Sequence, residues 1–179
     1  MSVTYEGATE QVRQIVHHHA LLRRGVERRC GALCEAAEHG IPFLRQMAIL
    51  RDYLAGEVLP HAEAEELTLY PAAAQTRGEL VRTLTAEHRT LAYLAGRLRP
   101  GADGGEAATV SEWIATLFAG HVAKENDLLL PALADSGADL AALLKENDLL
   151  LPALADSGAD LAALLADTHE PPSPRPASA

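Results

Sequence analysis

Aromatic residues are scarce in this chain of 179 residues, where Phe, Trp and Tyr together make up 4%. Strands favour aromatic and β-branched residues, whereas the Ala and Leu that dominate here favour helices. The composition therefore predicts an all-α protein. Hydrophobic residues at 48% and charged residues at 22% are ordinary values for a folded domain. We expect a single core rather than a disordered chain or several domains.

Cysteine is nearly absent, since Cys30 and Cys34 are the two in the chain. They lie four residues apart in a helical pattern and project from one face, where a disulfide closes only with strain. This excludes a small domain held together by disulfides. We interpret both as small core residues, and a redox-sensing dithiol is the alternative.

Positive charge and long apolar runs are also lacking. The chain has 15 Lys and Arg residues and 25 Asp and Glu residues, which gives a net charge of −10. Such a chain repels phosphate backbones and anionic lipid surfaces, so neither nucleic acid nor a membrane is an expected partner. No apolar run has the length of a bilayer span, and the opening residues MSVTYEGATE do not resemble a secretion signal. We expect a cytoplasmic protein.

Helical periodicity dominates what is present. Apolar residues recur at three- and four-residue spacing in four long stretches separated by short segments that contain Gly or Pro. Pro60 falls inside the second stretch and predicts a kink, and Pro131 is expected to end the fourth. Four such helices predict an up-down-up-down four-helix bundle over residues 1–144. The stretches are residues 9–39, 42–70, 77–99 and 106–130.

The end of the chain contains a tandem duplication. Residues 124–144, KENDLLLPALADSGADLAALL, recur without change as residues 145–165. This identity indicates a very recent duplication or a sequencing artefact, and a period seen twice is not a solenoid array. We expect 145–166 to form an appended C-terminal helical segment that packs on the bundle or mediates a homo-oligomer. Residues 167–179 are rich in Pro and small polar residues and are expected to be disordered.

Two histidines interrupt the apolar seams of the first and third helices. The two seams align at identical offsets, and each has one His, His19 or His88, where its other aligned positions are apolar. A single histidine in such a place is usually a core residue with a hydrogen-bond partner. The matching positions suggest instead that the chain is a degenerate two-fold repeat of helical hairpins.

The second and fourth helices carry a shared motif. HAEAEELTLYP and HVAKENDLLLP both have a Glu four residues after the His and a Pro ten residues after it. Residues four apart share one helix face, so His61 with Glu65, and His121 with Glu125, can each bind at one site. Glu146 copies Glu125 but lacks a His four residues earlier, so the first copy is the predicted ligand.

Counting residues from the connecting turns brings these six side chains to one level of the bundle, within about one turn. Six ionisable groups buried without a metal would each need a hydrogen-bond partner or a shifted pKa. They are too many for one tetrahedral zinc, whereas imidazoles with bridging carboxylates suit a pair of iron or manganese ions. We predict as metal ligands His19, His61, Glu65, His88, His121 and Glu125.

Several neighbouring residues have competing interpretations. His18 is the alternative to His19 as the first-helix ligand, whereas His17 is expected to face solvent. Glu66 is expected to be a surface charge, with the orientation of a ligand imidazole as the alternative. Core packing is the preferred interpretation for three tyrosines that could reach the centre: Tyr53, Tyr70 and Tyr93.

The order of these motifs resembles the hemerythrin-like (HHE cation-binding) proteins, which carry a His, an HxxxE, a second His and a second HxxxE on a four-helix bundle. The resemblance covers residues 10–131. It implies a non-haem centre of two Fe ions, bridged by an oxo or hydroxo group and by Glu65 and Glu125.

The resemblance also indicates which subgroup of this family the chain is more similar to. Oxygen-carrying members have a further His four residues from the third-helix ligand and an Asp five residues after the fourth-helix one. Here these positions hold Leu84 or Ala92, and Asn126. The chain is therefore more similar to the symmetric four-His, two-Glu subgroup, which is associated with nitrosative and oxidative stress, peroxide turnover or iron handling.

These observations predict a di-iron protein that binds or turns over a small ligand, O2, NO or peroxide, in sensing or stress detoxification. If the protein is an enzyme, we expect its activity to be directed at peroxide or NO. The alternative is an iron storage or iron-sensing protein without catalytic activity.

Overall fold

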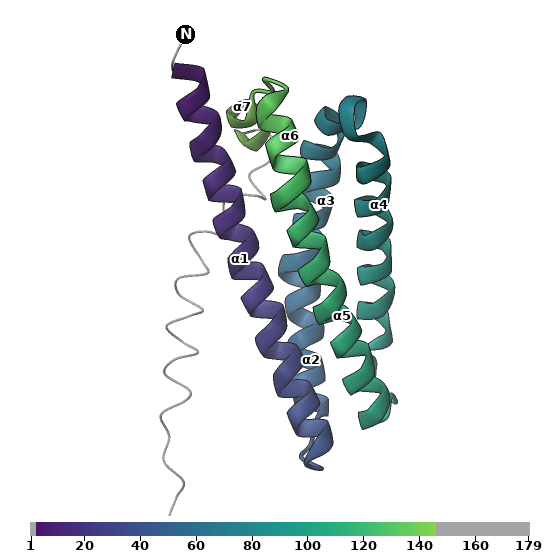
Figure 1. The fold of residues 1–179 in the computed structure, drawn as a ribbon. Coiled ribbons are helices and arrows are strands. Elements are labelled where there is room, and N and C mark those ends of the chain that lie inside the picture. The colour runs from purple at the N-terminus through teal and green to yellow at the C-terminus, as the bar shows by residue number, and fades with distance from the viewer. Residues whose placement is uncertain (1–2, 146–179) are drawn as a thin grey trace, which may run out of the picture.

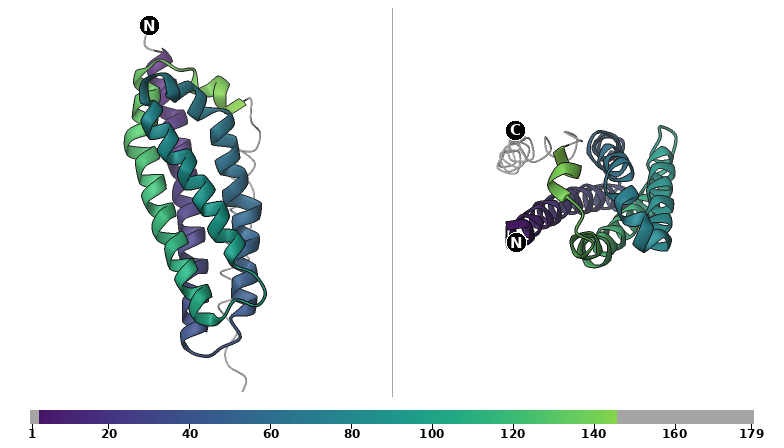
Figure 2. Two further views of the ribbon diagram at one scale, coloured as in Figure 1. Left: turned by 90° about the vertical axis from the view of Figure 1, so that its right-hand side faces the viewer. Right: turned by 90° about the horizontal axis from the view of Figure 1, so that it is seen from above.

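The computed structural model describes residues 3–145 and shows an up-down-up-down bundle (Figure 1; Figure 2). α1 runs along the bundle, α2 to α3 return beside it, α4 descends, and α5 to α6 return. The described residues contain no strand, so the predicted all-α four-helix bundle is confirmed. The elements are α1 (Val3–Glu38), α2 (Leu44–Tyr53), η1 (Leu54–Val58), α3 (Leu59–Leu67), α4 (Leu69–Arg97), α5 (Gly104–Lys124), η2 (Glu125–Leu129), α6 (Leu130–Asp135) and α7 (Leu140–Lys145).

Two prolines lie inside long helical columns without ending them. η1 and η2 are π-helical turns, and each ends two residues before a proline, Pro60 or Pro131. Proline lacks an N–H and its ring collides with the carbonyl four residues earlier, so a wider turn lets the helix continue. The irregularity predicted at Pro60 is this π-helical turn, just before the proline. The predicted stop at Pro131 is wrong, because η2 carries the helix on into α6.

The boundary between the second and third helices differs from the one predicted from the sequence. α3 ends at Leu67, and α4 already begins at Leu69, ahead of the predicted start at residue 77. Arg77 itself has non-helical angles (φ −130°, ψ 35°), so a kink marks the predicted start. The fourth helix begins close to its predicted position, because the Asp103 side chain accepts a hydrogen bond from the Glu106 N–H at 2.8 Å.

The apolar core consists of two clusters with a polar layer between them. Along α1, Ile15 belongs to one cluster and Leu22 to the other, with His19 between them, and α4 repeats this order around His88. Apolar packing on both sides therefore holds the layer in place. Leu44 is 56% exposed because it lies in the first turn of α2, at the end of the bundle.

The two cysteines are free. Cys30 is buried, and Cys34 Sγ lies 3.2 Å from the Ser111 hydroxyl. Burial, together with the nearby Cys34, raises the pKa of Cys30 to about 12, which keeps this group a neutral thiol. This favours the core interpretation over the dithiol.

The first copy of the duplicated segment forms the end of this column. It runs from Lys124 through η2, α6 and α7, with a turn at Gly137 (φ 75°). α6 and α7 lie at the end of the bundle where α1 begins (Figure 2). The predicted helix over 145–166 lies outside the described residues apart from Lys145, and the predicted tail over 167–179 lies wholly outside them. Within 3–145, no helix has both the length and the apolar character that crossing a membrane requires.

Candidate metal centre

Six ionisable side chains meet in the polar layer between the two apolar clusters. Each of them is at most 5% exposed. They come from all four helical columns, as the repeated motifs predict. Their burial side by side inside a bundle requires strong mutual interactions or a bound cation. They are the residues predicted as ligands: His19, His61, Glu65, His88, His121 and Glu125.

Local helix geometry explains how each pair is presented. His61 Nε2 lies 3.1 Å from Glu65 Oε1, one turn further along α3. His121 Nε2 lies 3.3 Å from Glu125 Oε1, where α5 passes into η2. The HxxxE spacing therefore places a nitrogen and an oxygen donor side by side in both columns.

The two carboxylates connect the histidines into overlapping groups. Glu65 Oε1 is 3.1 Å from His19 Nε2, and Glu65 Oε2 is 3.6 Å from His88 Nε2. Glu125 Oε2 is 3.7 Å from His19 Nε2 on the other side. Candidate ligand atoms within 4.8 Å of one another form two groups that share Glu65. We call them the first half-site (His19, His61 and Glu65) and the second half-site (Glu65, His88, His121 and Glu125).

Three atoms that face the centre have no hydrogen-bond partner in the described part of the chain. They are His61 Nε2, Glu65 Oε2 and Glu125 Oε2. His61 Nε2 is close to Glu65, but the geometry is not that of a hydrogen bond. Such atoms are rare in folded proteins because burying an unpaired polar atom costs free energy. Their lone pairs and the mixed nitrogen and oxygen donor set fit a pair of metal ions.

In the metal-free protein, protons bound to the histidines stabilise this cluster. Burial alone would lower the pKa of His19, but its hydrogen bond to Glu65 and the charge of Glu125 raise the pKa to about 9. Burial would raise the pKa of Glu65, but the positive charge of His61 and a hydrogen bond to His19 hold that pKa well below its usual value. His121 also has a raised pKa, because its interactions with Glu125 outweigh burial. Metal binding must displace these protons.

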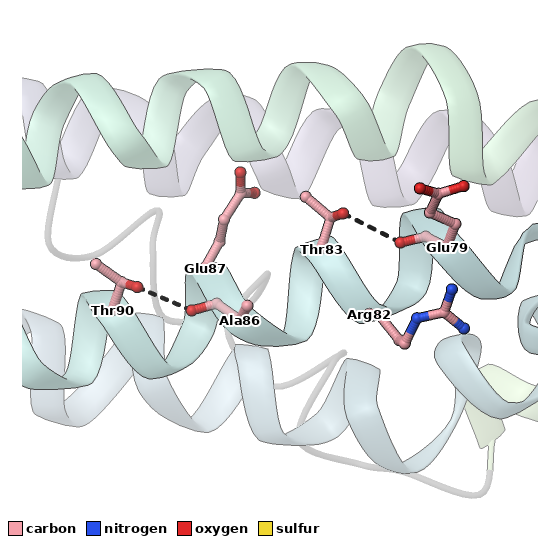
Figure 3. Close-up of a pocket in the computed structure, with 6 residues that line it drawn as sticks. All are labelled: Glu79, Arg82, Thr83, Ala86, Glu87 and Thr90. Atoms are coloured by element: carbon pink, nitrogen blue, oxygen red, sulfur yellow. Dashed lines mark hydrogen bonds between the residues drawn. The ribbon is translucent and has the colours of Figure 1, made fainter.

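Carboxylates lie behind both histidines of the second half-site. His88 Nδ1 donates to Glu66 Oε1 at 2.9 Å, and His121 Nδ1 donates to Glu87 Oε2 at 3.0 Å. Lys124 Nζ donates to Glu87 Oε1 at 2.6 Å. Glu87 lines a shallow surface groove of α4 (Figure 3). The orienting role considered for Glu66 therefore matches its position, whereas nothing in the sequence pattern pointed to Glu87.

Within residues 3–145, the first half-site has no such carboxylate. His19 Nδ1 donates to Asn126 Oδ1 at 2.7 Å. Among the described residues, none accepts a hydrogen bond from His61 Nδ1. The His18 ring instead lies edge-on to His61, with 4.9 Å between ring centroids. Burial and the charge of His61 lower the pKa of His18 to about 3, so this imidazole is neutral.

The structure distinguishes among the three consecutive histidines of α1. His19 belongs to the first half-site, whereas His18 is buried beside it without joining either half-site. His17 is exposed, as predicted. The geometry therefore favours His19 over His18 as the first-helix donor.

Tyr70 reaches the centre. Its hydroxyl donates to Glu125 Oε1 at 2.6 Å and lies 3.3 Å from His88 Nε2. Burial and the charges of the two central carboxylates raise the pKa of Tyr70, so the phenol keeps its proton. The interpretation of Tyr70 as a packing residue alone is incomplete. Tyr53 lies away from the centre against Arg29, and Tyr93 is 63% exposed, so its assignment to the core is wrong.

Comparisons with known proteins agree with the buried cluster. Residues 11–133 match the family model of the hemerythrin HHE cation binding domain. This match covers more than half of the chain. No curated protein and no solved structure matches the chain significantly. The chain belongs to the hemerythrin HHE cation-binding family.

Proposed function

We propose that this domain binds two iron ions through the six buried ligands and uses them to bind or turn over O2, NO or peroxide. One observation carries the proposal. Four imidazole Nε2 atoms and two carboxylates converge in one buried layer, and Glu65 and Glu125 each reach histidines of both half-sites.

The donor set supports a pair of ions rather than one. A structural zinc uses four ligands in a closed tetrahedron, and here six donors share two carboxylates. Imidazole with bridging carboxylate is the donor chemistry of non-haem di-iron sites in helical bundles. Two irons held there would supply open coordination positions and the electrons for reducing a small ligand.

The surroundings of the site determine what can reach it. The six donors are buried between two apolar clusters, so only small molecules can approach without opening the bundle. Tyr70 Oη keeps its proton and donates it to Glu125 beside His88, and the same O–H, turned away from Glu125, would donate a hydrogen bond to such a molecule. A buried hydrogen-bond donor next to a ligand position favours polar diatomics and peroxide over inert gases.

Two substitutions test this function. His61→Ala and His121→Ala each remove one donor, and each variant is expected to bind less iron than the wild type and to lose reactivity toward peroxide and NO. His17→Ala is the matched control, because His17 lies on α1 near the site but is exposed. The measurements are iron content and the change in visible absorption when hydrogen peroxide or an NO donor is added.

Two results would contradict the proposal. Full reactivity in both alanine variants would place the chemistry elsewhere. A wild-type protein that binds iron and gains thermal stability, but reacts with neither peroxide nor NO, would favour an iron-storage or iron-sensing role.

A further inference from the structure

We propose that the two half-sites are unequal and fill in a fixed order, the second half-site first. Glu66 and Glu87 place a carboxylate behind each histidine of the second half-site, whereas the first half-site has none among the residues that the structure describes. The inference rests on the proposed function, since it concerns the order in which the two metal positions are filled.

The carboxylates of the second half-site reach across helix interfaces. Glu66 on α3 accepts from His88 on α4, and Glu87 on α4 accepts from His121 on α5. Figure 3 shows the Glu87 side chain rising from α4 toward the neighbouring column. Lys124 holds the other Glu87 oxygen at 2.6 Å, so this carboxylate is itself fixed in place.

The partners of the first half-site are weaker acceptors. Asn126 offers His19 a neutral amide oxygen at 2.7 Å. His61 Nδ1 is buried without an acceptor in residues 3–145, and the His18 ring packs edge-on against the His61 ring. Within the described part of the chain, neither histidine of this half-site has a negatively charged acceptor on its Nδ1.

This difference changes how strongly each imidazole binds a metal. An acceptor on Nδ1 selects the tautomer that leaves Nε2 free, fixes the ring and, when it is charged, makes Nε2 a stronger donor. Losing such a partner typically weakens metal binding by about 10- to 100-fold. With two carboxylates on one half-site and none on the other, we expect the first metal to bind at least about 10-fold more tightly than the second.

The test is a titration of the metal-free full-length chain with Co²⁺ under anaerobic conditions. Visible absorption and calorimetry resolve the two binding steps. Glu66→Gln and Glu87→Gln keep side-chain size but remove the charge, and each should weaken the tight step by about 10-fold or more without changing the weak one. Glu63→Gln is the matched control, because Glu63 is exposed on the same helix as Glu66, and it should titrate like wild type.

Ligand variants then assign the steps to positions. His61→Ala should keep the tight step and lose the weak one, whereas His88→Ala should lose the tight step. Two equal steps in the wild type, or unchanged titrations of both glutamine variants, would overturn the fixed order but leave a two-metal site intact. A wild-type chain that binds no Co²⁺ would overturn the proposed function itself, and the order with it.

Discussion

The metal-free protein should lose stability as the pH rises from about 6 to about 9, and His19 is the main cause. The pKa of this buried imidazole is raised from 6.5 to about 9. A folded-state pKa above the unfolded value means that the folded chain binds the proton more tightly. The resulting stability is fully present below the unfolded pKa and is lost as the pH rises through the folded one.

The magnitude follows from the two pKa values. Each tenfold change in proton affinity corresponds to about 1.4 kcal/mol, so the difference between 6.5 and about 9 is worth about 3 kcal/mol. Because His19 is fully buried, solvent does not screen this interaction appreciably. The pKa of His121 is also raised and adds to the loss in the same direction.

Urea unfolding measures this loss directly. Protein freed of metal with a chelator is unfolded at several pH values across this range, and the free energy of unfolding should fall by about 3 kcal/mol or more. His19→Gln should flatten the dependence, whereas His17→Gln, an exposed neighbour on α1, should keep it. Metal-loaded protein should not show the fall, because metal has replaced the proton. A free energy of unfolding that stays level or rises in the metal-free wild type would refute the reasoning.

Further predictions concern the surroundings of the centre. Tyr70→Phe removes the 2.6 Å hydrogen bond to the Glu125 carboxylate and should destabilise metal-free protein by about 2 kcal/mol in urea unfolding; no change would contradict this contact. Gly25→Ala places a Cβ in steric conflict with the Tyr53 hydroxyl, so overpacking of about 1–3 kcal/mol should exceed the gain of roughly 1 kcal/mol in helix propensity and lower the melting temperature; a higher one would contradict it. Asp103→Ala removes the N-cap of α5 and should cost about 1 kcal/mol in urea unfolding, and an unchanged midpoint would show that the cap is dispensable.

The residues at the centre could be predicted because they obey helix periodicity. His19 and His88 occupy seam positions that are otherwise apolar, and the HxxxE spacing pairs a histidine with a glutamate on one face. An ionisable residue at a position that the periodicity assigns to the core can be recognised from the sequence alone. The structure brings these six side chains together as the spacing indicates.

The contacts around them could not be predicted in the same way. Glu87 and Asn126 act across helix interfaces, where the outcome depends on the rotation and height of two helices rather than on spacing along one. Core packing is the preferred interpretation of Tyr70 from the sequence, and only the position of its hydroxyl in the structure shows that it reaches the centre.

The path of the helix through Pro131 also depends on more than local propensity. A proline in that position normally ends a helix, and the sequence does not show that a π-helical turn will absorb it. Leu129, the last residue of that turn, and Leu130, which follows it, are fully buried, so packing of the continuing helix compensates for the local cost.

Iron content per chain tests the central claim most directly. The protein is expressed in iron-supplemented medium, purified without a chelator or a histidine tag, and analysed by mass spectrometry for bound metals. About two iron ions per chain are predicted from six ligands that share two carboxylates. No bound metal, or a single zinc ion, would contradict the account.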